Sequence, residues 1–246
     1  MFLPFGEWLP DLAALGNPGA ITATNVVPRT DKSYGPIGLL TTTTNALTAR
    51  AQGAFAGRAK GGTVTNFAAD ASKLYTLSLV TWSDKSKAGG YATAADDTVR
   101  FTQQGETVIA TNFNDAMQAW TLDVSALFAD LAAAAPKARH VASIDPGFIM
   151  AGNTSDAVDG AVPNRLWWGG FKAPTNWPTV GTAAAQSVQS DRQDLPTGGW
   201  IQAIIGAIGG RRGLIFTETS IFGVDYEGPP TVFGFYEIER ARGTPA

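Results

Sequence analysis

The sequence predicts an all-β protein with a β-propeller-like fold, in which repeated antiparallel blades follow an extended N-terminal arm. Gly and Pro are frequent, with 28 and 14 copies among 246 residues, and this favours many turns over long helices. Short runs of β-branched and aromatic residues alternate with these turns, as in strands. Similar runs recur roughly every 40–50 residues, a spacing typical of propeller blades.

The clearest repeat lies in the first half of the chain. The tripeptide Thr-Asn-Phe at 65–67 recurs at 111–113, 46 residues later, and each copy follows a β-branched run. Downstream, residues 74–78 and 119–123 match in residue type and lie 45 residues apart. The pattern predicts a strand, a glycine turn, a strand, a polar loop and a further strand. Such small sheets cannot bury both faces alone, so radial stacking of the units is expected.

The same order recurs less clearly at residues 140–168 and 201–224. A β-sandwich whose hairpins are alike by chance is the alternative fold, and the agreement in order, spacing and residue type favours the propeller. Ten apolar residues at matched repeat positions are expected to be largely buried. They are Phe55, Phe67, Leu74, Leu77, Phe101, Val108, Leu122, Ile149, Leu214 and Phe216.

Composition divides the chain into an arm and a repeat region. Residues 1–50 are rich in proline and threonine and predict an N-terminal arm with a turn-rich connection, whereas residues 51–246 carry the repeats. A loop insertion rich in Asn, Asp, Thr and Pro is expected at about 152–199. The Ala-rich segment 125–137 predicts one short helix.

The start of the arm is apolar but interrupted. Pro4 and Pro10 block a continuous helix or a central strand across it. We therefore expect an extended segment that buries its side chains on the chain's own propeller or, as we favour, on a neighbouring subunit. The candidate interface residues here are Phe2, Leu3, Phe5, Trp8 and Leu9.

Charge and cysteine content exclude several kinds of site. Cys is absent and His140 is the single histidine, which excludes disulfides, thiolate zinc sites and a multi-histidine metal site within one subunit. The formal net charge of −3 gives no basic footprint for nucleic acid. The longest apolar stretch, at 200–210, is far shorter than the roughly 20 residues a membrane span needs. The sequence predicts no metal and no cofactor.

No motif indicates catalysis, and we predict that the protein is not an enzyme. The chain lacks the G-x-S-x-G hydrolase elbow and the phosphate-binding P-loop. His140 lies in an apparent strand, where a lone histidine is usually structural. Residues 153–160 offer oxygen ligands for Ca²⁺ without a matching spacing. A carboxylate pair for glycoside hydrolysis could come from several acids: Asp96, Asp97, Asp191, Asp194, Glu218, Asp225 and Glu227.

Three of the seven tryptophans cluster in the expected insertion, namely Trp167, Trp168 and Trp177. Flat aromatic faces suit sugar stacking, but in repeat proteins such residues more often pack one blade on the next or fill a subunit interface. We therefore predict packing or an interface for these three side chains.

A series of motifs in fixed order resembles the β-propeller tail proteins of short-tailed bacteriophages, known as stabilisation, tail hub or nozzle proteins. No single motif is specific, and the order carries the resemblance over nearly the whole chain. The motifs are Phe-Gly-Glu-Trp-Leu-Pro-Asp at 5–11, Asn-Arg-Leu-Trp-Trp at 164–168, Ala-Pro-Thr-Asn-Trp at 173–177, Gly-Gly-Trp-Ile at 198–201, Phe-Thr-Glu-Thr-Ser-Ile at 216–221 and Tyr-Glu-Gly-Pro-Pro at 226–230.

The resemblance implies a structural virion protein that assembles in the host cytoplasm. It implies a homo-oligomeric ring, expected to be a hexamer, which joins the portal and adaptor to distal tail parts and lines the channel through which genomic DNA passes. Family members usually continue after a segment like that at 243–246, so the chain is expected to be a shortened member or an incomplete propeller. The alternative function is a propeller lectin or glycan hydrolase acting on host surface polysaccharide.

Overall fold

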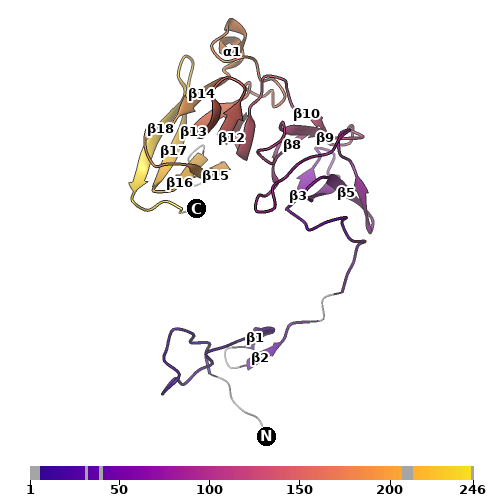
Figure 1. The fold of residues 1–246 in the computed structure, drawn as a ribbon, viewed down its shortest axis with the longest axis vertical. Coiled ribbons are helices and arrows are strands. Elements are labelled where there is room, and N and C mark those ends of the chain that lie inside the picture. Colours follow the sequence, from indigo (N-terminus) through magenta and orange to yellow (C-terminus); the bar gives the residue numbers. More distant parts are fainter. Residues whose placement is uncertain (1–5, 31–32, 39–40, 207–212, 245–246) are drawn as a thin grey trace. The chain divides into compact units, whose positions relative to one another are not determined.

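The computed structural model describes residues 6–30, 33–38, 41–206 and 213–244, and it is all-β apart from one short helix (Figure 1). The chain divides into two compact units, Met1–Thr43 and Thr44–Ala246. The division falls before residue 50, the predicted end of the connection, because residues that follow Thr43 pack on the first sheet. The Thr44 hydroxyl accepts a hydrogen bond from Trp82 Nε1 at 3.2 Å, and Thr48 Oγ1 lies 2.6 Å from the Tyr75 hydroxyl.

The second unit contains four four-stranded sheets, and in each sheet consecutive strands pair antiparallel. The repeated antiparallel blades are therefore confirmed. The first sheet contains β3 (Gly53–Arg58), β4 (Val64–Ala69), β5 (Leu74–Ser78) and β6 (Thr81–Asp84). The second contains β7 (Arg100–Gln104), β8 (Thr107–Thr111), β9 (Gln118–Thr121) and β10 (Ala129–Asp130). The third contains β11 (Lys137–Ile144), β12 (Phe148–Asp156), β13 (Gly160–Trp168) and β14 (Asp191–Asp194). The fourth contains β15 (Ile201–Gly206), β16 (Gly213–Thr217), β17 (Ser220–Gly228) and β18 (Val232–Arg240).

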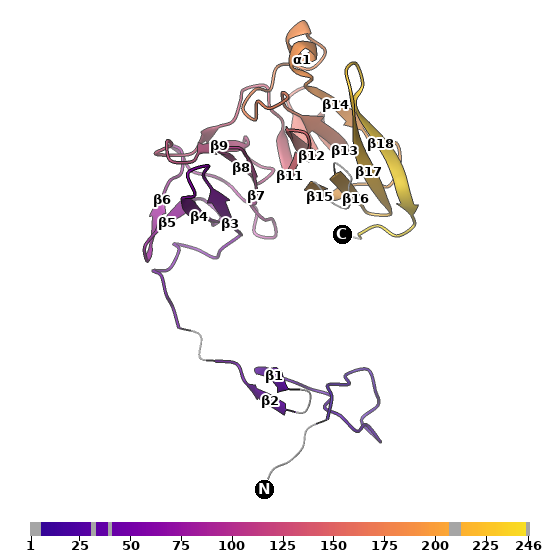
Figure 2. The ribbon, with the colours of Figure 1, turned by 180° about the vertical axis from the view of Figure 1, so that it is seen from behind.

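The sheets stack in chain order, as blades of a propeller do. The first strand of each sheet contacts the first strand of the next, from β3 to β7, β11 and β15 (Figures 1 and 2). One apolar core lies between each neighbouring pair of sheets. A four-stranded sheet of this kind has two faces to bury, and neighbouring blades supply the cover.

Aromatic rings dominate two of these cores. Between the first two sheets, the Phe67 ring meets the rings of Trp120 and Phe128 edge-on, each at 5.8 Å between centroids. Between the last two sheets, Phe233 packs edge-on against Phe148 at 4.9 Å and Trp168 at 5.2 Å. Such edge-to-face contacts add to the burial of apolar area and orient the sheets.

The ten expected core residues are confirmed in part, since none is exposed but only half are buried. The buried ones are Phe67, Leu74, Val108, Leu122 and Ile149. The half-buried ones are Phe55, Leu77, Phe101, Leu214 and Phe216.

Two expectations about irregular segments are wrong. Residues 152–199 are not a loop insertion, because they contain the end of β12, all of β13 and β14, and helix α1 (Ala183–Val188). Their polar residues find partners in the folded chain, as where Asn153 Nδ2 on β12 donates to the Ile201 carbonyl on β15 of the next sheet at 3.3 Å. The Ala-rich segment 125–137 forms no helix and contains the short edge strand β10, because pairing with β9 overrides its helical propensity.

The N-terminal unit contains a two-stranded antiparallel sheet, β1 (Val26–Thr30) and β2 (Ser33–Pro36). Trp8 forms a parallel bridge with Ala20, and its indole Nε1 donates to the Ile21 carbonyl at 3.2 Å. In its described part, this unit contributes no buried hydrophobic residue, and it exposes several large ones instead. These are Trp8, Leu12, Leu15, Ile21, Val26, Val27 and Ile37.

We expect residues 44–246 to fold without the N-terminal unit, since the described cores lie entirely within them. A variant that lacks residues 1–43 should unfold cooperatively, with a midpoint within about 2 °C of the full chain. Thermal unfolding followed by circular dichroism measures this. A broad transition, or a midpoint lowered by more than about 5 °C, would show that residues 1–43 contribute to the fold.

Candidate functional site

A groove of about 930 Å³ lies beside the third sheet. The loop 132–135 lines one side of it, and the turn between β12 and β13 lines another. Trp167, Val180 and Arg192 also line it. We call this hollow the Trp167 groove. Its lining is mainly apolar and includes the charged side chains of Asp130, Lys137, Asp156 and Arg192.

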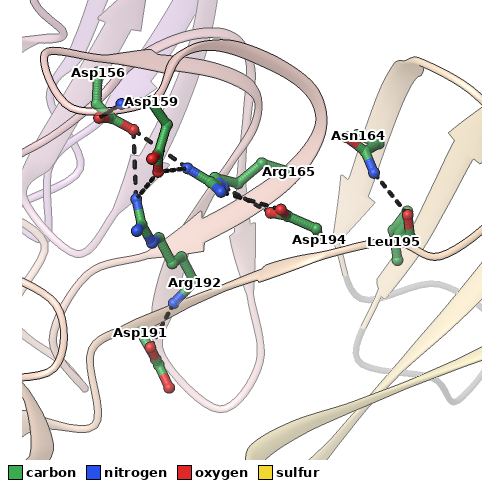
Figure 3. Close-up of polar contacts among 8 residues, drawn as sticks. All are labelled: Asp156, Asp159, Asn164, Arg165, Asp191, Arg192, Asp194 and Leu195. Carbon is green, nitrogen blue, oxygen red and sulfur yellow. Dashed lines mark hydrogen bonds and ion pairs between the residues drawn. The ribbon is translucent and has the colours of Figure 1, made fainter.

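A charged network ties the turn between β12 and β13 to strand β14 beside this groove (Figure 3). The Arg165 guanidinium binds Asp194 through two hydrogen bonds, with Nε donating to Oδ1 at 2.6 Å and Nη2 donating to Oδ2 at 3.0 Å. Its Nη1 donates to Asp159 at 2.5 Å. Arg192 contacts the same Asp159 carboxylate at 2.8 Å and Asp156 at 3.5 Å.

The pKa shifts in this network favour side chains that stay charged over side chains that exchange protons. The hydrogen bond from Arg165 holds the pKa of Asp159 below its usual range, and Arg192 acts in the same direction. The hydrogen bond to Asp194 raises the pKa of Arg165, whose side chain is nearly buried. A carboxylate with a lowered pKa is a poor general acid near neutral pH. This cluster is therefore better suited to holding the strands together than to acid–base catalysis.

The three tryptophans of the expected insertion pack within the chain. Trp167, Trp168 and Trp177 are 5%, 1% and 3% exposed and lie in the cores between sheets, so they leave little surface for a sugar or a partner. Their role in a subunit interface stays a prediction. Arg192 covers the Trp167 ring with its guanidinium carbon 5.1 Å from the ring centroid. The indole Nε1 of Trp168 donates to the Gln189 carbonyl, which fixes the segment before β14.

The remaining predicted interface residues belong to the N-terminal unit. Trp8 is 56% exposed and Leu9 is half-buried, so both can contact a partner. Phe2, Leu3 and Phe5 lie outside the described residues. Their role in an interface stays a prediction.

Several candidate acids are engaged in structural contacts. Asp97 accepts from Arg139 at 2.9 Å, and Glu218 accepts from the backbone N–H of Trp200 at 3.0 Å. In the segment considered for Ca²⁺, Asp156 and Asp159 contact arginines, which supply the positive charge there. Within the described parts of the chain, no group of three or more acidic or histidine side chains is placed to hold a metal ion.

His140 is buried on β11, where it faces the fourth sheet. It pairs with Gly152, and its buried Nε2 has no hydrogen-bond partner among the described residues. Burial lowers the pKa of His140 to about 4, and the positive charges of Arg100 and Arg139 act in the same direction. The imidazole is therefore neutral at pH 7, as a structural residue of this core.

We expect acid to weaken the fold through His140. Because its pKa is lower in the folded chain than in the unfolded chain, its contribution is complete above pH 6.5 and is lost as the pH falls from 6.5 toward 4. The free energy of unfolding should fall by about 2 kcal/mol between pH 7 and pH 5 from this group alone. Urea unfolding at both pH values measures this. If a His140→Asn variant loses as much stability between them as the wild type, the histidine is not responsible.

One hollow was not anticipated from the sequence. Its volume is about 310 Å³, and the exposed ring of Trp200 borders it. Asn164, Pro196 and Thr197 also line it. The glycines before Trp200 are the available sequence signal, because Gly198 and Gly199 adopt positive φ values of 92° and 79° and turn the chain just before the fourth sheet.

No protein-family model matches the chain, and no curated protein matches it. The described residues contain no helix with the length and apolarity needed to cross a membrane.

Proposed function

We propose that this protein is a structural subunit of a bacteriophage tail, of the hub or nozzle kind, and that it performs no chemistry. Copies assemble as a ring, expected to be a hexamer, between the portal and adaptor side and the distal tail parts. The ring lines the channel through which genomic DNA leaves the particle. The assignment to a phage tail rests on the ordered motifs that resemble short-tailed phage hub proteins.

The observation that carries an assembly role is the N-terminal unit. Its described part exposes seven large hydrophobic side chains and buries none, although the second unit has full cores. Apolar surface that a compact unit cannot bury marks a contact with another chain. The ion pairs of the Trp167 groove agree with this, because they hold strands together and leave no free acid–base pair.

The test is the size of the purified chain in solution. Light scattering after size exclusion should give a multiple of 25.7 kDa, and negative-stain images should show rings. A variant that lacks residues 1–11 should keep the folded second unit and lose its contacts with neighbouring tail subunits. A chain that stays monomeric at all accessible concentrations, and does not associate with portal or adaptor proteins, would contradict the proposal.

The alternative function is a lectin or glycan hydrolase, and the hollow beside the exposed Trp200 ring is the observation that supports it. An exposed indole beside Asn164 and Thr197 is a suitable stacking platform for a sugar ring. Oligosaccharide binding that a Trp200→Ala variant loses, in a monomeric protein, would favour this alternative. Release of sugar from a surface polysaccharide would favour the hydrolase.

A further inference from the structure

We propose that the Trp167 groove of one copy binds the N-terminal unit of a second copy, through the six residues 7–12 that carry Trp8. We call these residues, with the sequence Glu-Trp-Leu-Pro-Asp-Leu, the Trp8 segment. This inference rests on the proposed function, because it names two surfaces by which neighbouring copies of a ring would contact each other.

The Trp8 segment has a fixed backbone and exposed apolar side chains. The Ala20 N–H donates to the Glu7 carbonyl at 2.8 Å, and the Leu9 N–H donates to the Ala20 carbonyl at 2.9 Å. The side chains of Trp8 and Leu12 are nevertheless 56% and 50% exposed. A segment whose backbone is already ordered loses little conformational entropy when it binds a partner. Trp8 is therefore presented as an anchor for another surface.

The Trp167 groove has room for such an anchor. Six alanines line it, at positions 116, 132–135 and 157, together with the larger Trp167 and Val180. Small side chains leave space above the backbone, and the volume of about 930 Å³ lies in the range of pockets that bind drug-sized groups. Aromatic side chains that fill pockets of this kind supply most of the binding energy of many protein interfaces.

The groove also includes a residue with an unused hydrogen-bond donor. The Nε1 of Trp167 is buried and has no hydrogen-bond partner among the described residues. A buried indole N–H usually has an acceptor, because leaving it unpaired costs free energy. The Trp8 segment can supply one, since backbone carbonyls beside Pro10 are not engaged by a regular sheet. Extended segments that contain proline commonly bind in grooves lined by aromatic residues.

Charge favours the Trp8 segment as the occupant of the groove. Among the described residues, Lys137 forms no ion pair, whereas the other charged side chains that line the groove each form one. Glu7 and Asp11 are exposed, and neither belongs to an ion pair in the described parts of the chain. The segment carries these two carboxylates and no cation, so it complements the unpaired lysine.

The two surfaces differ, so the contact between copies is heterologous. Each copy offers one Trp8 segment and one Trp167 groove. Every added copy leaves one surface of each kind free until the series of copies closes on itself. A contact of this kind therefore generates a closed ring when the rotation between neighbours permits it.

Substitutions on each surface of the full chain test the contact. Trp8→Ala removes the anchor, and Ala133→Glu fills the groove at an exposed position of its wall. Each should raise the dissociation constant for self-association by roughly 30-fold, measured by sedimentation velocity. Ala184→Glu is the matched control, because Ala184 is exposed on α1 and does not line the groove. It should assemble as the wild type does.

A charge exchange tests which groups meet. Lys137→Glu alone, and Glu7→Lys combined with Asp11→Lys, should each weaken self-association about tenfold, because like charges would face each other. An equimolar mixture of the two variants should recover the wild-type affinity, since each segment then meets a groove of opposite charge. A mixture that associates no better than either variant would overturn the proposed pairing.

Circular dichroism first shows that each variant is folded. If Trp8→Ala and Ala133→Glu both assemble with the wild-type affinity, the groove contact is overturned and the proposed ring stands. If only Trp8→Ala weakens assembly, the Trp8 segment binds another surface, and the groove contact is again overturned. A wild-type chain that remains monomeric would overturn the contact and the proposed ring together.

Discussion

Replacing Trp168 with alanine is expected to lower the free energy of unfolding by about 3–5 kcal/mol, the largest effect of any single change considered for this chain. The side chain is 1% exposed and lies in the core between the third and fourth sheets. Its ring contacts Phe233 edge-on and Phe235 at 6.0 Å, and its Nε1 donates to the Gln189 carbonyl. Alanine would leave a cavity and remove the hydrogen bond to the half-buried Gln189 carbonyl.

Urea unfolding measures this loss, and Trp200→Ala is the matched control. Trp200 is 55% exposed, so its removal should change the stability by less than about 0.5 kcal/mol. Equal effects of the two substitutions would show that the core between the third and fourth sheets does not depend on Trp168.

The second large effect is expected at Arg165. Its replacement by alanine should cost about 3 kcal/mol, because Asp194 would lose its partner, and Asp156 and Asp159 would keep only Arg192. The turn between β12 and β13 would lose its tie to β14, so increased hydrogen exchange at 156–160 and 191–194 should accompany the loss of stability.

Arg240→Ala is the control for Arg165. Arg240 also binds a carboxylate, that of Glu237, but its side chain is 77% exposed, and an ion pair in water contributes little. No resolvable change in stability is expected. A loss at Arg240 as large as that at Arg165 would mean that burial does not determine the importance of these ion pairs.

Local sequence patterns predicted the repeated unit well. Glycine turns and β-branched runs specify a strand and its reversal within a few residues, so the strands of the first two sheets follow from the pattern at 65–78 and 107–123. The pattern failed at 152–199, where Asn153 and Thr154 look like loop residues. These polar side chains are buried in β12, and no local rule can show that a sheet will cover them.

The candidate site depended still more on distant parts of the chain. Asp156 and Asp159 resemble an ordinary turn, or part of a cation loop, until β14 brings Asp194 and Arg192 beside Arg165. The three tryptophans gave no sign of which neighbour would cover them. In the folded chain, other parts of the same chain do so.

By itself, the sequence determined that the chain is all-β, that its strands come in repeated groups, and that its N-terminal residues are apolar without a core. Strand propensity and turn chemistry depend on neighbours along the chain, so they can be recognised in order. Only the tertiary structure decided which apolar residues are covered. Phe67 and Phe216 pair with the matched repeat positions Phe55 and Ala203, yet Phe67 is buried in the core shared with the second sheet, while Phe216 remains half-buried on the fourth sheet. Whether a residue is buried depends on which distant surface packs against it, and that contact forms only in the folded chain.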